Sequence, residues 1–319
     1  MKFDLDAQQR DFAASIDSAL STAGVPAAVR AWAAGDTAAG RKVWARLAEL
    51  GVTALMVPER FDGLAAHPVD LVVAMERLGR WCVPGPITES IAVAPMLLAD
   101  DERCAALAAG ELVATVALPP DVPRAVDADS AGLVLIAGPG GVAEADPHDQ
   151  HASVDPSRRL FDVTAAGAPR PADVARAYEF GALTTAAQLL GAGQAVLDMA
   201  VDYAKQRTQF GRAIGSYQAI KHKLADVHIA IELARPLVYG AALALAEGGS
   251  STARDVSAAK VAAADAALLA AQSALQTHGA IGFTAEHDLS LWLLRVQALR
   301  PAWGNPAVHR RRVLEAIQP

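Results

Sequence analysis

The residues best suited to binding chemistry lie in one stretch, 203–218, within a region of helical periodicity. Arg207 offers a planar guanidinium with five donors, which suits a pyrophosphate. Phe210 offers a ring for a flat heterocycle, and Gln218 offers a free amide. Because Arg207 and Phe210 are three residues apart, they are predicted to share a helix face or its frayed end. The alternative interpretation is an exposed arginine and a core phenylalanine at a corner between two helices.

A second candidate stretch covers residues 276–283, Gln-Thr-His-Gly-Ala-Ile-Gly-Phe. Gln276 and His278 carry polar groups, and Gly279 and Gly282 at a helix end would let a phosphate or ribose approach backbone N–H groups. A glycine cluster after a helix is also typical of a simple C-terminal cap and turn. The sequence leaves both interpretations open.

Composition bounds the class of protein. The chain has 319 residues, of which 53% are hydrophobic and 5% aromatic, and its formal net charge is −7. Small apolar residues favour closely packed helices, and the acidic balance argues against a nucleic-acid surface. Cys82 and Cys104 lack the spacing of a zinc site, so no metal site is expected. No apolar run is expected to span a membrane, and the start of the chain lacks a secretory segment, which indicates a cytoplasmic protein.

Hydrophobic periodicity predicts a mainly α chain with a small β section. Residues 1–110 are predicted to form an N-terminal helical domain, 111–170 a reduced β domain and 171–319 a C-terminal helical bundle. The predicted strands are 112–118, 133–137 and 160–163. The predicted long helices are 172–209, 217–247 and 252–279, and the shorter ones are 6–20, 38–50, 68–78, 89–98, 285–299 and 306–317. Gly79 is predicted to end the helix that begins at Pro68.

This order of parts resembles the acyl-CoA dehydrogenase family. Residues 47–51, followed by 57–59 and Gly63, are similar to the family's N-terminal signature, and residues 76–80 follow at a suitable spacing. The stretches 203–218 and 276–283 fall in the family's order in the third part. The resemblance covers nearly the whole chain. It implies the acyl-CoA dehydrogenase fold, with an N-terminal helical domain, a middle β domain and a C-terminal four-helix bundle.

The resemblance also implies FAD as the cofactor and a role across a dimer interface. In the family these segments reach a neighbouring subunit's FAD. Arg207 would contact the pyrophosphate, Phe210 would pack by the adenine or flavin ring, and Gln218 would bond the adenosine portion. The second contact would be formed by Gln276, His278 and Gly279. Family members oxidise an acyl-CoA thioester to the trans-2-enoyl-CoA, a carboxylate removes the α-proton, and an electron-transferring flavoprotein reoxidises the flavin.

By the same resemblance, the residues that would serve this chain's own catalytic site are replaced by others that cannot do so. Trp303 occupies the position of the family's catalytic glutamate, and an indole cannot accept a proton. Gly181 and Ala182 occupy the other position that the family uses for its base. Glu179, about half a turn away, remains a candidate base, with a surface or capping carboxylate as the alternative. No segment that would embrace a flavin follows the first predicted strand.

The residues that would reach a neighbouring subunit's FAD are thus present, whereas those that would serve this chain's own site are replaced. We therefore expect the non-catalytic subunit of a heteromeric (α2β2) acyl-CoA dehydrogenase, whose full-length partner supplies the flavin-binding β domain and the catalytic glutamate. The chain resembles the short subunits of paired actinobacterial steroid acyl-CoA dehydrogenases, which favours bulky steroid-CoA substrates. A vacated second site would widen the room for them. The other expected partners are the acyl-CoA substrate and an electron-transferring flavoprotein, with no nucleic acid and no membrane.

Three alternatives stay open. A self-sufficient homo-oligomeric acyl-CoA dehydrogenase would use an unrecognised base such as Glu179. A flavin-dependent monooxygenase of the same fold would not need the missing glutamate. A purely structural binding module would make no contact with the cofactor through Arg207.

Overall fold

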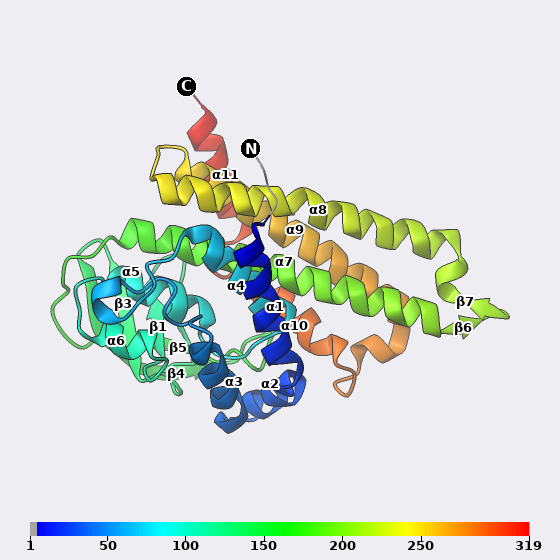
Figure 1. The fold of residues 1–319 in the computed structure, drawn as a ribbon, viewed down its shortest axis with the longest axis horizontal. Coiled ribbons are helices and arrows are strands. Elements are labelled where there is room, and N and C mark those ends of the chain that lie inside the picture. The colour runs from blue at the N-terminus through cyan, green and yellow to red at the C-terminus, as the bar shows by residue number, and fades with distance from the viewer. Residues whose placement is uncertain (1–4, 319) are drawn as a thin grey trace.

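The computed structural model describes residues 5–318. Three long helices lie side by side, with the small sheet towards one end of the molecule and a short hairpin at the other end (Figure 1). The chain is mainly helical with a small β section, which confirms the predicted fold class.

The N-terminal part is helical, as predicted, but contains two helices that the sequence pattern did not reveal, α2 and α6. Its elements are α1 (Ala7–Ser21), α2 (Val25–Ala33), α3 (Ala38–Glu49), a 3-10 turn (Glu59–Phe61), α4 (Pro68–Arg80), a π-turn (Glu89–Val93), α5 (Ala94–Leu97) and α6 (Arg103–Ala108). Asp6 caps α1 by accepting a 2.8 Å hydrogen bond from the backbone N–H of Gln9, which fixes where that helix begins.

The prediction that Gly79 ends α4 was wrong, because the helix continues to Arg80. A Cβ at Gly79 would lie 2.1 Å from the backbone oxygen of Gln188 in α7 (Val174–Gln206). Gly79 therefore lets two helices approach at backbone distance, and packing rather than termination explains it.

The β section is one five-stranded sheet in the order β1-β3-β4-β5-β2. The strands are β1 (Ala114–Ala117), β2 (Ala125–Val126), β3 (Leu133–Gly138), β4 (Gly141–His151) and β5 (Leu160–Ala165). β1 pairs with β3 in parallel and the other pairings are antiparallel. The sequence predicted β1, β3 and β5 and missed β2, which has two residues, and β4. The second half of β4 is polar, mostly exposed and interrupted by a register shift between His148 and Gln150.

The C-terminal part is the predicted bundle. It contains α7, the strands β6 (Thr208–Gln209) and β7 (Arg212–Ala213), a 3-10 turn (Ile214–Ser216), α8 (Gln218–Glu247), α9 (Thr252–His278), a second 3-10 turn (Gly279–Phe283), α10 (Leu289–Leu299) and α11 (Pro306–Ile317). α10 begins four residues later than predicted, after the 3-10 turn and loop that follow α9.

Three helical segments are long and apolar enough to cross a membrane by length and composition, which corrects the expectation that no apolar run reaches that length. They are Val174–Gln206, Gln218–Glu247 and Thr252–Phe283. In α7 the apolar window is 94% buried within the molecule, so its hydrophobicity is accounted for by the core. In α8 the corresponding share is only 39%.

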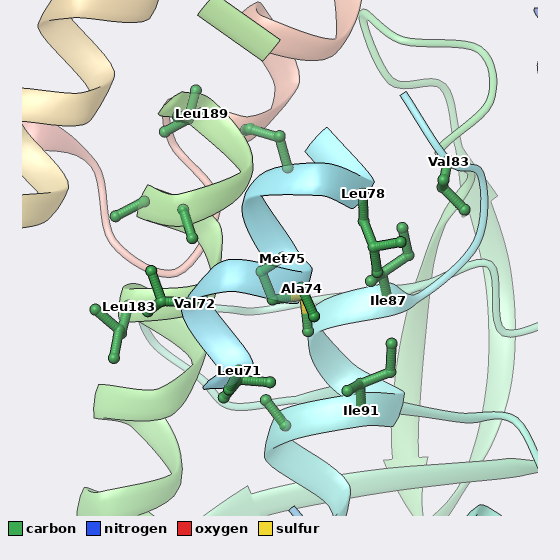
Figure 2. Packing of buried hydrophobic residues seen from close by; sticks show 14 of the residues in the cluster. Leu71, Val72, Ala74, Met75, Leu78, Val83, Ile87, Ile91, Leu183 and Leu189 are labelled. Carbon is green, nitrogen blue, oxygen red and sulfur yellow. The ribbon is translucent and has the colours of Figure 1, made fainter. Parts of the chain in front are cut away.

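α7 is the centre of the fold because other elements pack closely against several of its faces. Figure 2 shows leucine, valine and methionine side chains of α4 packed against Leu183 and Leu189 of α7. A Cβ at Gly191 would lie 1.8 Å from the backbone oxygen of Glu76 in α4, and one at Gly193 would lie 3.3 Å from the Cα of Ala267 in α9. Small residues along α7 therefore set the distances between helices.

We expect Gly191→Ala to lower the free energy of unfolding by about 1–3 kcal/mol, because the added methyl forces α4 away from α7. Urea unfolding of the purified protein measures this as a lower midpoint at unchanged slope. Gly249→Ala is the matched control, since an added Cβ there meets nothing within 4 Å. Equal midpoints for the two variants would contradict the close contact.

Candidate functional site

The predicted binding stretch forms a hairpin rather than a helix face, which corrects the placement of Arg207 and Phe210. α7 ends at Gln206, and Arg207 is its extended C-terminal cap. Thr208 pairs with Ala213 and Gln209 pairs with Arg212, so Phe210 and Gly211 form a two-residue turn. Both have positive φ, 52° and 78°, as a type I′ turn requires. The turn stops the helical hydrogen-bond pattern that the periodicity suggested.

Phe210 has a backbone conformation and a solvent exposure that are unfavourable for a phenylalanine. Its φ of 52° lies in the left-handed region, where bulky residues are outliers, and its surface is 92% exposed. Packing within the chain explains neither feature. Conformational strain together with an exposed aromatic ring is typical of a binding residue.

The base of the hairpin is fixed by contacts with Tyr217. Its hydroxyl donates to the backbone oxygen of Gln209 at 3.3 Å, and the guanidinium of Arg212 lies 4.0 Å from the centre of its ring. Gly215 brings the following turn close to α7, since a Cβ there would lie 3.0 Å from the backbone oxygen of Ala204. Arg207 and Phe210 are thus presented on a supported, exposed hairpin, and Gln218 is exposed at the start of α8.

The second predicted stretch lies at the same end of the bundle. Lys223 in the first turns of α8 donates a hydrogen bond to the side-chain oxygen of Gln276 at the end of α9. The ring of Tyr203 in α7 stacks on that of His278, with ring centres 4.3 Å apart. These contacts tie the ends of α7, α8 and α9 together, so the structure brings the two stretches into one surface (Figure 1).

His278 and Gly279 occupy this surface differently from Gln276. The ring of His278 is buried between Tyr203 and His287, its Nδ1 lies 2.8 Å from the backbone oxygen of Ala274, and burial lowers its pKa. Gly279 has φ 66°, and its N–H already donates to the backbone oxygen of Leu275. Its contribution is open space, since no atom lies within 4 Å of an added Cβ. At this helix end, the polar side chain of Gln276 is therefore exposed, whereas that of His278 is buried.

At the opposite end of α7, Trp303 fills the position where a catalytic base was sought. The indole is 1% exposed and packs directly on Gly181, where an added Cβ would lie 2.2 Å from an indole carbon. The two positions at which the resemblance predicts the base, 181 and 303, are therefore in contact, and the indole fills the space beside Gly181. The expectation of a vacated site is wrong at this position, because the indole of Trp303 fills the space beside Gly181.

Trp303 is held from both sides. Its backbone oxygen accepts hydrogen bonds from Nε2 of His309 at 2.8 Å and from the hydroxyl of Tyr178 at 3.4 Å. Because a carbonyl only accepts, Nε2 of His309 carries the proton and Nδ1 accepts from Ser257 at 3.1 Å. Burial lowers the pKa of His309 to about 4. Lys260, fully buried, donates to the backbone oxygen of Arg300 at 2.9 Å in the same loop.

Glu89 is a site residue that sequence reasoning missed. It begins the π-turn Glu89–Val93, is 2% exposed, and its Oε1 accepts a 2.9 Å hydrogen bond from the indole nitrogen of Trp303. Its Oε2 makes no hydrogen bond with the residues that the structure describes. The signal for it was a glutamate just before the apolar helical run 91–98, because a buried carboxylate needs a partner.

Glu179 points away from this position. It lies two residues before Gly181, about 200° around α7, and pairs with Arg312 of α11. Burial raises its pKa, opposed by the Arg312 guanidinium. Both residues line a cavity of about 580 Å³ between the turns after β1 and β3 and the start of α7. A carboxylate already bonded to a guanidinium beside Tyr178 is poorly placed to act at Trp303.

The fold and these sites define the class of protein. The profile described as "Acyl-CoA dehydrogenase, N-terminal domain" matches residues 6–100, and "Acyl-CoA dehydrogenase, C-terminal domain" matches residues 173–318. The chain belongs to the acyl-CoA dehydrogenase family, whose members are FAD-dependent oxidoreductases, which confirms FAD as the cofactor expected from the resemblance.

Individual relatives extend this assignment over nearly the whole chain. Acyl-CoA dehydrogenase IpdE2 of Mycobacterium tuberculosis is 34% identical over 301 residues, covering 90% of each chain. Acyl-CoA dehydrogenase FadE34 of the same organism is 33% identical and covers 94% of this chain, but the match takes up only 46% of FadE34. A chain of the ChsE4-ChsE5 complex from Mycobacterium tuberculosis has the same fold, with a TM-score of 0.86 and 21% identity. The match covers 100% of this chain and 100% of that chain.

Trp303→Phe tests the contact with Glu89. The ring stays while the N–H is lost, so a buried carboxylate loses its donor and the free energy of unfolding should fall by about 1–3 kcal/mol. The same substitution in a Glu89→Gln background should cost less, because a neutral amide is cheaper to leave unpaired. Denaturant unfolding of the four proteins forms a double-mutant cycle, and zero coupling would contradict the contact.

His309→Gln tests the loop that holds Trp303. The folded-state pKa of His309, about 4, lies below its ordinary value of 6.5, so protonation favours unfolding as pH falls below 6.5. Between pH 6.5 and 5 this group should remove about 2 kcal/mol from the stability of the wild type. The glutamine variant does not titrate. The stability difference between the two proteins, measured by urea unfolding, should therefore shrink by that amount, and a pH-independent difference would refute the burial of a neutral imidazole.

Proposed function

We propose that this chain is the non-catalytic subunit of a heteromeric acyl-CoA dehydrogenase and completes the FAD site of a full-length partner. The observation that carries the proposal is the contact of Trp303 with Gly181. It places an indole, hydrogen-bonded to Glu89, where a base and the reacting carbons of a substrate would have to meet. Neither an indole nor a glycine can remove an α-proton.

The opposite end of the chain fits a flavin dinucleotide. Arg207, Phe210, Gln218 and Gln276 are exposed on one surface, with a guanidinium for a pyrophosphate, a ring for a heterocycle and amides for an adenosine. Those four side chains would hold FAD, which would supply the hydride acceptor for the oxidation of an acyl-CoA. This chain's residues bind and orient the dinucleotide, and the partner supplies the base.

Three relatives support an unlike partner and a bulky substrate. The ChsE4-ChsE5 structure is a complex of two differently named chains, and FadE34 has more than half its length outside the part that matches this chain. A solved relative with a TM-score of 0.84 is described as a steroid ACAD formed by Tcur3481 and Tcur3483. We propose an α2β2 assembly that dehydrogenates steroid side-chain CoA thioesters and passes electrons to an electron-transferring flavoprotein.

The test uses a tagged copy of this chain, isolated from its native host together with the full-length acyl-CoA dehydrogenase that copurifies. Arg207→Ala should weaken FAD binding by about 10- to 150-fold, because a charge-assisted contact is worth roughly 1.5–3 kcal/mol. Arg254→Ala, at the other end of α9 in a half-exposed ion pair, should leave flavin content unchanged. Flavin absorbance per subunit pair and turnover of steroid-CoA esters are the measurements.

The same preparation separates the alternatives. Turnover by this chain alone, lost in Glu179→Gln, would establish a self-sufficient enzyme and end the proposal. Oxygen consumption with reduced flavin would indicate a monooxygenase. Unchanged FAD content in Arg207→Ala would indicate a structural module.

A further inference from the structure

We propose that the cavity between α2, α9 and α10 binds an uncharged polycyclic molecule with a hydroxyl at one end and a carbonyl at the other, as in a neutral steroid. The cavity has a volume of about 510 Å³, and residues 155–157, which lie between β4 and β5, form part of its wall. Among the residues that the structure describes, its lining includes neither the hairpin that carries Arg207 nor Trp303. It is therefore separate from the hairpin surface and from the core around Trp303. The choice of a steroid rests on the proposed function, whereas the cavity and its chemistry do not.

One face of each helix forms the wall of this cavity. The lining residues of α10 include four that are spaced three or four apart and so share a helix face: Ser290, Leu293, Leu294 and Gln297. The other two helices contribute apolar pairs that are four residues apart, Val29 and Ala33 on α2 and Ala271 and Leu275 on α9. A concave, mostly apolar wall with a few polar groups, enclosing roughly 300–1,000 Å³, is typical of a small-molecule site.

The charged groups in the wall are already paired. Arg30 donates a hydrogen bond to the carboxylate of Asp288 at 2.7 Å, and Asp155 accepts one from the guanidinium of Arg295 at 2.6 Å. Among the described lining residues, no cation is therefore left for a phosphate or a carboxylate. Because an unpaired charge is costly to bury, an uncharged ligand is favoured over a nucleotide, a CoA ester or a fatty acid.

The polar side chains of the α10 face lie at its two ends. Ser290 and Gln297 are seven residues apart, which is about 10 Å along the helix, and Leu293 and Leu294 lie between them. The hydroxyl of Ser290 already donates to the backbone oxygen of His287 at 2.8 Å, so it is left to accept from a ligand hydroxyl. The amide of Gln297 makes no hydrogen bond with the residues that the structure describes, so it is free to donate to a carbonyl.

A rigid tetracyclic skeleton matches this arrangement. With one oxygen at each end, it would reach both polar groups while its rings pack on the two leucines between them. A fatty acyl chain has a polar group at one end only and would leave the other unpaired.

Phe283 supplies an aromatic ring at the edge of the cavity. It ends the 3-10 turn Gly279–Phe283, lines the cavity and is 76% exposed. A bound ring system would cover part of this exposed aromatic surface, which favours binding. Because Leu275 lines the same cavity and precedes Gln276, the ligand would lie beside the end of α9 that carries the second predicted stretch.

The test measures the binding of tritiated testosterone, a neutral steroid with a carbonyl at one end and a hydroxyl at the other, to the purified full chain by equilibrium dialysis. Binding should saturate at one molecule per chain, and palmitate in excess should not displace the steroid. Absence of saturable binding, or displacement by palmitate, would overturn the proposal.

Two variants place the binding in this cavity. Ala33→Trp puts an indole into it and should raise the dissociation constant at least tenfold, while Gln297→Leu should raise it about 2- to 10-fold, because one hydrogen bond is lost. Ala253→Trp, at a half-buried alanine in the first turn of α9, is the matched control and should bind as the wild type does. Equal urea midpoints for the two tryptophan variants would show that both fold. Wild-type affinity in Ala33→Trp would refute the site.

The outcome is independent of the test of the proposed function. If the full chain binds no steroid while its complex with the full-length subunit holds flavin and turns over, only the cavity assignment fails. A complex without flavin, formed by a chain that still binds testosterone, would instead refute the proposed function.

Discussion

The structure depends on how closely α7 lets other elements approach its backbone. Gly191 and Gly193 admit α4 and α9, and Gly181 admits the indole of Trp303. Any side chain at these positions would overlap atoms that are already in contact, or press on them closely. Glycines along α7 therefore have two effects. They bring the helices of the bundle close together, and at position 181 the glycine provides no base and leaves space for the indole of Trp303.

The surroundings of Trp303 are part of the protein core. The indole adds aromatic surface to the interior, and its N–H satisfies one oxygen of Glu89. His309 and Lys260 fix the backbone of the loop rather than any ligand. A buried polar network of this kind stabilises one arrangement of the loop only while each member keeps its partner.

The sequence predicted the parts of this picture that depend on periodicity and composition. Long apolar helices and the division into helix, sheet and bundle could both be derived from residue types. Interactions between distant segments could not. Gly79 looked like a helix end because its partner, Gln188, is more than a hundred residues away, and Glu89 has a role only once Trp303 lies beside it. Phe210 looked helical because nothing in its spacing shows that it takes a positive φ.

The two ends of α7 differ in whether their polar side chains are buried or exposed, and this contrast favours a site shared between two subunits. At the Gly181 end, polar groups are buried and mostly paired within the chain. At the Arg207 end, an exposed aromatic ring sits in a strained conformation and polar side chains face outward. In the proposed arrangement, the contacts to one dinucleotide come from two subunits. A homo-oligomer of this chain would therefore need both ends of α7 to be open to ligand in every copy. In the proposed arrangement, a chain with one filled end and one open end is completed by a partner whose own catalytic end is open.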